Sequence, residues 1–163
     1  MLDKLLARLA KTPSPASDTV GAPFPRRQLA VAALLIELAQ IDRAIRPVEW
    51  KTIERVLRQR FGVDADTASR MIAAARIELD AALEDWIFAN AVREAFDERE
   101  RIGIVEQLWD VVYADGVPAR LEASLMRRLC DELGIGKEDR EAARAQAFAR
   151  NGGRRAGGAA GTE

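Results

Sequence analysis

A chain of 163 residues, of which 48% are hydrophobic and 31% charged, is long enough to bury the core of one globular domain. Its formal net charge of -1 provides no long-range attraction to nucleic acid or to an anionic membrane, so neither is expected as the main partner. The sequence has no histidine, which removes the commonest general base and transition-metal ligand, and its single cysteine, Cys130, cannot form an internal disulfide, which favours the reducing cytoplasm.

The first residues have the pattern of a short amphipathic helix. Within residues 1–11 the leucines fall on one helical face and the charges on the other, at Leu2, Leu5, Leu6 and Leu9 against Asp3, Lys4, Arg8 and Lys11. A helix of this length is marginal by itself in water, so we expect it to pack against protein. Peripheral contact with a membrane surface is the alternative, although no apolar run approaches the length of a membrane span.

Composition divides the rest of the chain into three parts. Residues 12–25 have prolines at 13, 15, 23 and 25 among Ser, Gly and Ala, which predicts a flexible linker. Residues 26–149 carry helical apolar periodicity and form the predicted domain. Residues 150–163 are rich in Gly, Ala and Arg without periodicity, which predicts a disordered tail.

The first half of the domain predicts four helices. Residues 29–41 are almost continuously apolar, as is typical of a buried central helix. Pro47 suits the first position of a second helix, and Gly62 suits its end. Asp64 can cap a third helix, and Asp80 can begin a fourth.

The second half predicts three more helices. Asp97 and Glu100 have the spacing of a capping box, which opens a counterpart of the central helix. The next helix begins near Pro118 and ends at Gly134. The last is predicted over 137–148.

No segment has the alternation of a β-strand, so the sequence predicts an all-α bundle of about seven helices in a single domain. Leu83 and the tryptophans Trp50, Trp86 and Trp109 fall within the helical periodicity. We therefore expect Leu83 in the core, and the tryptophans either in the core or in the groove of a partner, rather than at a ligand site.

An acidic turn occurs twice in this pattern. Asp42 is followed seven residues later by Glu49, and Asp115 is followed at the same spacing by Glu122. Superposing the two aspartates also pairs apolar positions: Leu35 with Leu108, Leu38 with Val111, Ile53 with Met126, Val56 with Leu129, and Leu57 with Cys130. The bundle is therefore interpreted as two pseudo-repeated helical hairpins.

Two interpretations of the four acids remain open. The first is local: each aspartate accepts backbone N–H groups of its turn, and each glutamate caps the next helix. The second is that Asp42, Glu49, Asp115 and Glu122 bind a hard divalent cation such as Ca²⁺ or Mg²⁺, which prefers oxygen ligands. The chain has no Gly-rich phosphate loop and no nucleophile motif, so an enzyme is not predicted; an enzyme with a carboxylate–metal site is the alternative.

Two stretches resemble the TerB-like tellurite-resistance family. Residues 34–57, LLIELAQIDRAIRPVEWKTIERVL, resemble its first half, and residues 96–133, FDERERIGIVEQLWDVVYADGVPARLEASLMRRLCDEL, its second. In that family an alanine-aspartate-glycine turn precedes a glutamate in both halves. The second half here matches this motif with Asp115, Gly116 and Glu122, whereas the first has Arg43 in place of the glycine.

The resemblance implies a helical bundle of about seven helices, similar to a domain found in DjlA-type co-chaperones. It also implies a non-catalytic module associated with tellurite or metal stress, with an acidic surface that meets metal ions. We expect this module to bind a protein partner that the sequence does not identify; a purely structural adaptor with no metal role is a further alternative.

Overall fold

The computed structural model describes residues 24–41, 45–84, 86–114 and 120–158. These residues form seven helices and no strand. The helices are α2 (Arg26–Ala39), α3 (Pro47–Phe61), α4 (Ala65–Ala81), α5 (Trp86–Ala95), α6 (Glu98–Val112), α7 (Arg120–Glu132) and α8 (Lys137–Gly158). The all-α prediction is confirmed, and residues 1–11 and 12–23 lie outside the described part of the chain.

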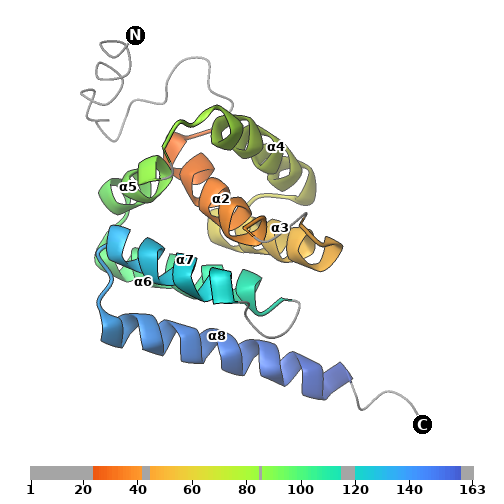
Figure 1. Ribbon diagram of the computed structural model, residues 1–163. Coiled ribbons are helices and arrows are strands. Elements are labelled where there is room, and N and C mark those ends of the chain that lie inside the picture. Colours follow the sequence, from red (N-terminus) through yellow and green to blue (C-terminus); the bar gives the residue numbers. More distant parts are fainter. Residues whose placement is uncertain (1–23, 42–44, 85, 115–119, 159–163) are drawn as a thin grey trace.

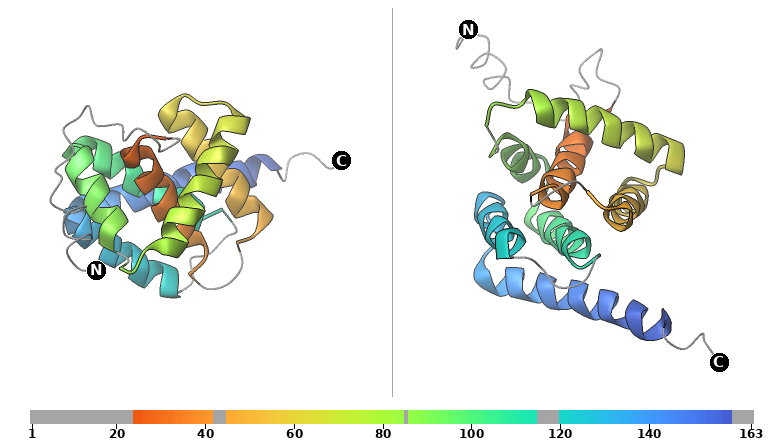
Figure 2. Two further views of the ribbon diagram at one scale, coloured as in Figure 1. Left: turned by 90° about the horizontal axis from the view of Figure 1, so that it is seen from above. Right: turned by 45° about the vertical axis from the view of Figure 1, so that its right-hand side comes forward.

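Helix α2 lies at the centre of the bundle because it is apolar around its whole circumference. Every residue from Leu29 to Ile36 is buried, and α2 packs against α3, α4, α5, α6 and α7. The helices are stacked around it (Figure 2): α4 lies at one end, then α5, α2 and α3, then α7 and α6, and α8 crosses the other end. Helix α6 is thus enclosed between the centre of the bundle and α8.

Several predicted helix ends are confirmed by their capping geometry. The Asp64 carboxylate accepts a hydrogen bond from the Thr67 N–H at 2.7 Å, at the N-terminus of α4. Asp97 and Glu100 form the reciprocal capping box of α6. Gly62 ends α3 in the left-handed region with φ of 64°, which a residue without Cβ adopts without strain.

The prediction for the chain around Asp80 was wrong. Helix α4 continues through Asp80 to Ala81, because residues 76–81 contain no glycine or proline to stop it, and the chain turns only at Ala82. Leu83 therefore lies in the connection to α5 with 82% of its surface exposed, and Trp86 is 41% exposed at the start of α5. Neither belongs to the core, whereas Trp109 is buried as predicted.

Helix α8 runs well beyond Phe148, where its predicted end lay. It continues to Gly158, so the predicted tail boundary at residue 150 falls inside a helix. Arg150 and Asn151 both hydrogen-bond to Asp110 of α6, which ties this polar part of the helix to the bundle. Local periodicity carries no information on side-chain contacts with a distant helix. The helix end predicted from the sequence is therefore ten residues too early.

The apolar positions that the repeat pairs are all buried. Leu35, Leu38, Ile53, Val56 and Leu57 are at most 1% exposed, and so are their counterparts Leu108, Val111, Met126, Leu129 and Cys130. The two sets occupy α2 and α3 in one case, and α6 and α7 in the other. This burial is consistent with the two-hairpin interpretation, which stays a prediction.

Candidate functional site

The two predicted glutamates occupy equivalent places in the fold. Glu49 is the third residue of α3, and Glu122 is the third residue of α7. Both are buried, with 5% and 7% of their surface exposed. A carboxylate in the first turn of a helix is stabilised by the positive end of the helix dipole, which offsets part of its desolvation.

Glu49 caps its own helix. Its Oε2 atom accepts a hydrogen bond from the Arg46 backbone N–H at 2.7 Å, which supplies a partner for one of the N–H groups left unpaired at a helix start. The local interpretation is therefore confirmed for this residue. Asp42 and Asp115 lie outside the described residues, so the convergence of the four acids on a cation stays a prediction. Among the residues that the structure does describe, no cluster of three or more acids or cysteines has an arrangement suited to a metal ion.

The sequence analysis did not single out two further acids, of which Asp110 is buried and Glu37 is mostly covered, with 13% of its side chain exposed. Glu37 of α2 and Asp110 of α6 each lie five residues before the aspartate of an acidic turn, so they occupy the same place in the two hairpins. The Glu37 carboxylate pairs with Arg128 of α7 at 3.2 Å, and the Asp110 carboxylate pairs with Arg150 of α8 at 2.8 Å. The signal that could have found them is an isolated acid within a long apolar helical face, which must have a partner when buried.

Asp110 is the centre of a polar clasp between α6 and α8. It is 5% exposed, and both of its oxygens accept hydrogen bonds from Arg150 Nη2, at 2.9 and 2.8 Å. The Asn151 amide donates to it at 3.0 Å and also to the Ala147 carbonyl at 2.7 Å. Arg150 further pairs with Glu106. Burial would lower the pKa of Arg150, but its hydrogen bonds to Asp110 and Glu106 outweigh burial and raise that pKa above its ordinary value.

An aromatic cluster extends from this clasp to the molecular surface. Trp109 and Tyr113 of α6 stack with ring centroids 5.8 Å apart, and Phe148 of α8 meets Tyr113 edge-on at 5.6 Å. The Arg144 guanidinium lies 5.0 Å from the centre of the Trp109 ring, and its Nε donates to the Tyr113 hydroxyl at 2.9 Å. Such contacts fix the arginine in one geometry.

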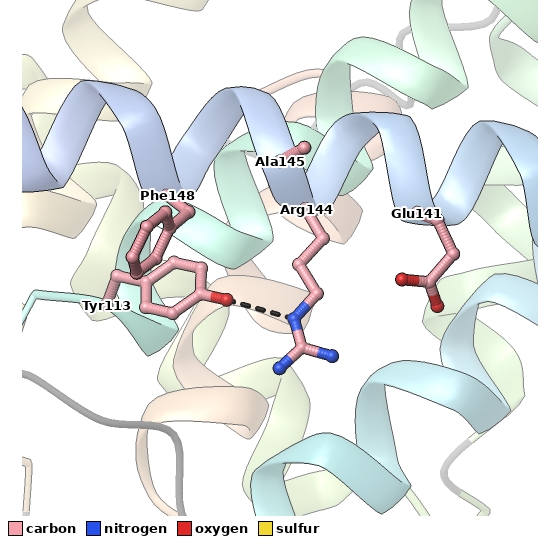
Figure 3. Close-up of a pocket in the computed structure, with 5 residues that line it drawn as sticks. All are labelled: Tyr113, Glu141, Arg144, Ala145 and Phe148. Atoms are coloured by element: carbon pink, nitrogen blue, oxygen red, sulfur yellow. Dashed lines mark hydrogen bonds between the residues drawn. The ribbon is translucent and has the colours of Figure 1, made fainter.

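The outer side of this cluster is an open depression between α6 and α8 (Figure 3). Tyr113, Glu141, Arg144, Ala145 and Phe148 line it. Phe148 stands at its edge with 62% of its surface exposed, whereas Tyr113 is 8% exposed. The depression therefore offers an aromatic surface with one fixed cation and one carboxylate, which is suited to contact with another molecule rather than to enclosing a small substrate.

Cys130, a residue of α7, lies in the hydrophobic core of the bundle. Burial raises the pKa of its thiol to about 11, so it is protonated at neutral pH and is not a nucleophile there. Its expected burial is confirmed.

The protein is thus an all-α bundle with buried glutamates at equivalent positions of two helices and with an aromatic depression on its surface. The sequence model of the family described as "Tellurite resistance protein TerB" matches residues 28–145, and the chain belongs to this family. Searches of the curated proteins and of the solved structures gave no match. The family match covers the bundle up to the middle of α8, so it includes Tyr113, Glu141 and Arg144, whereas Phe148 and Arg150 lie beyond it. In the described part of the chain, no helix has the length and apolar character that crossing a membrane requires.

Proposed function

We propose that this TerB-family protein is a non-catalytic protein-interaction module that acts in a cellular response to tellurite or metal stress. The observation that carries the interaction role is the depression beside α8, where exposed Phe148 adjoins Tyr113 and Arg144. Aromatic residues and arginine contribute most of the binding energy at the centres of protein interfaces. Aromatic side chains offer a large contact area with few rotatable bonds, and arginine offers several hydrogen-bond donors. The family description supports the tellurite context.

Two further features support a binding role over catalysis. The Tyr113 hydroxyl and the Trp109 ring already hold Arg144 in place. Binding a partner therefore does not cost the conformational entropy of ordering this long side chain. Cys130, the strongest nucleophile type in the chain, is buried with a pKa of about 11. Catalysis by this thiol would require its exposure and a nearby cation to lower that pKa.

The interaction role is tested with Phe148→Ala and the control Val48→Ala. Val48 is also an exposed apolar residue, at 42%, but it lies on α3. Tagged wild-type protein and both variants are used for quantitative affinity capture from cells grown with tellurite. We expect a protein that the wild type and Val48→Ala retain and Phe148→Ala loses, with a loss of about 2 kcal/mol or roughly 30-fold in Kd. Identical partner sets for all three proteins would refute this role for the depression.

The stress role has a separate test. A strain that lacks the protein is complemented with the wild type or with Phe148→Ala, and growth is measured on tellurite. Restored growth with the wild type alone is the expected result. A deletion strain that tolerates tellurite as well as its parent would overturn the proposed context.

A second candidate function is binding of a divalent cation, Ca²⁺ or Mg²⁺, at the acidic turns. The burial of Glu49 and Glu122 at matching helix positions supports this function, because carboxylate oxygens are the ligands that these hard cations prefer. Asp115 and Glu122 are the better pair, because the second turn keeps the glycine that follows the aspartate, Gly116, whereas the first turn has Arg43 at that position.

Calorimetric titration with Ca²⁺, Mg²⁺, Mn²⁺ and Zn²⁺ tests this function. We expect heat of binding from the wild type that Asp115→Asn and Glu122→Gln remove and that Asp66→Asn, on the outer face of α4, leaves unchanged. An absence of heat, or heat that both site variants retain, would exclude a cation at this turn.

A further inference from the structure

The outer face of α4 carries an uncharged strip. Helix α4 lies at one end of the stack of helices, with its inner face on α2 and α3 (Figure 1). Exposed uncharged positions recur every four residues along its outer side, and the exposed apolar residues Leu83 and Trp86 follow them in the chain. We call this set the α4 strip: Ala65, Ser69, Ala73, Ile77, Ala81, Leu83 and Trp86.

The large side chains of the α4 strip are unusually accessible. Ile77 is 70% exposed and Leu83 is 82% exposed. Removing apolar surface from water is favourable, so a partner that covers these side chains is stabilised. The small residues at Ala73 and Ala81 flank Ile77 along the helix, which lets another helix approach the backbone closely.

We propose that the leucine face of residues 2–11 docks on the α4 strip of the same chain and covers Ile77, Leu83 and Trp86. The leucines recur at steps of three and four residues, which places them in one row along a helix. Such a row packs into the groove beside the small residues of a second helix. Docking also supplies the tertiary contact that a helix of this length requires.

Charge complementarity favours the same partner. Residues 1–11 contain Lys4, Arg8 and Lys11 against a single acid, Asp3. The edges of the α4 strip near Ile77 carry exposed Glu78, Asp80 and Glu84.

The nearest basic residue at that edge is directed elsewhere. The Arg76 guanidinium lies 5.4 Å from the centre of the Trp50 ring of α3. Opposite charges around an apolar contact add little affinity at an exposed surface, but they select the partner and its direction.

The tether between the two surfaces is long enough. The described chain begins at Phe24, so residues 12–23 connect it to the leucine segment. Twelve residues span up to about 40 Å when extended. A domain of this size has a radius of gyration of about 14 Å, so the leucine segment can reach α4 from the start of α2. A short tether also gives the docked segment a high effective concentration.

Hydrogen exchange of the full chain, measured by mass spectrometry, tests the docking. We expect the amides of residues 2–11 to exchange about tenfold or more slowly than in an unstructured peptide of the same sequence. The variant Ile77→Asp should abolish this protection, and Leu6→Asp should in turn speed exchange around Ile77. Val48→Asp, a charge placed on α3 at another exposed apolar position, should leave residues 2–11 protected.

Exchange in α6 serves as the folding readout, because the largely exposed Ile77 makes few core contacts. Unchanged α6 protection in Ile77→Asp shows that the bundle is intact. The proposal is overturned if residues 2–11 exchange freely in the wild type, or if Ile77→Asp leaves them protected.

Two other occupants are distinguished by the same measurement. Protection that disappears on dilution together with a dimer, followed by light scattering, would assign the leucines to a second copy and overturn intramolecular docking. Protection that arises only with phosphatidylserine-containing vesicles would assign them to a membrane surface and overturn it as well. Equal protection at all protein concentrations and without vesicles is the result we expect.

Discussion

Replacing Arg150 with methionine tests the clasp between α6 and α8. Methionine retains the apolar stem of the arginine but removes the cation that Asp110 faces. The Asp110 carboxylate is 5% exposed and accepts from Arg150 at 2.8 and 2.9 Å, so the variant leaves a buried charge with Asn151 as its remaining clasp donor. A buried charge without its counter-ion must either be hydrated by local opening or remain poorly solvated.

The magnitude follows from the exposure of the two partners. Breaking a fully buried pair costs about 3–5 kcal/mol, whereas an exposed pair contributes roughly 0–1 kcal/mol. The Arg150 side chain is 41% exposed and the Asp110 side chain 7%, so the clasp lies between these cases. We expect Arg150→Met to lower the free energy of unfolding by about 2 kcal/mol.

Urea unfolding followed by tryptophan fluorescence measures this loss, with Arg70→Met as the matched control. Arg70 pairs with Asp66 at 3.2 Å, but the two side chains are 65% and 82% exposed, so the control should lose less than about 0.5 kcal/mol. The double variant Arg150→Met/Asp110→Leu should recover much of the loss, because it removes the unpaired charge. Equal effects of Arg150→Met and Arg70→Met would refute the reasoning, and so would a double variant no more stable than Arg150→Met.

Three further predictions concern a helix end, a cap and the thiol. Gly62→Ala adds a Cβ at φ of 64°, where no atom outside the adjacent residues lies within 4 Å, so the cost arises from the backbone conformation alone. We expect the free energy of unfolding in urea to fall by about 1 kcal/mol, and an unchanged midpoint would contradict the left-handed end of α3. Hydrogen bonds from Thr67 lower the pKa of Asp64, so its stabilising effect is present above the unfolded pKa and is lost as pH falls through the lower folded pKa; Asp64→Ala should reduce the acid-side slope of stability against pH, and an identical slope would argue against the cap. Burial raises the pKa of Cys130 to about 11, so its reaction with a disulfide reagent at pH 8 should be about 100-fold slower in the native protein than in urea, and comparable rates would contradict its burial.

The candidate site was only partly accessible from the sequence. The acidic turns follow from local spacing, and the capping role of Glu49 is a local interaction over three residues. The depression was not predicted, because Tyr113 and Arg144 lie 31 residues apart in the chain and meet only when α8 folds across α6. The same reason explains why Asp110 and Arg150, 40 residues apart, were not paired.

The helical class, the buried central helix and most helix ends could be predicted from the sequence, because apolar periodicity and capping depend on residues only a few positions apart. At Gly62 the backbone N–H bonds to the Arg58 carbonyl, and in the Asp97–Glu100 capping box the two residues bond to each other. In both cases the bonded groups lie about one helical turn apart. The length of α8, the pairing of the acids and the exposure of particular apolar side chains required the three-dimensional structure. Those properties depend on contacts between distant segments: Leu83 and Phe148 satisfy the helical pattern as well as core residues do, yet they remain 82% and 62% exposed.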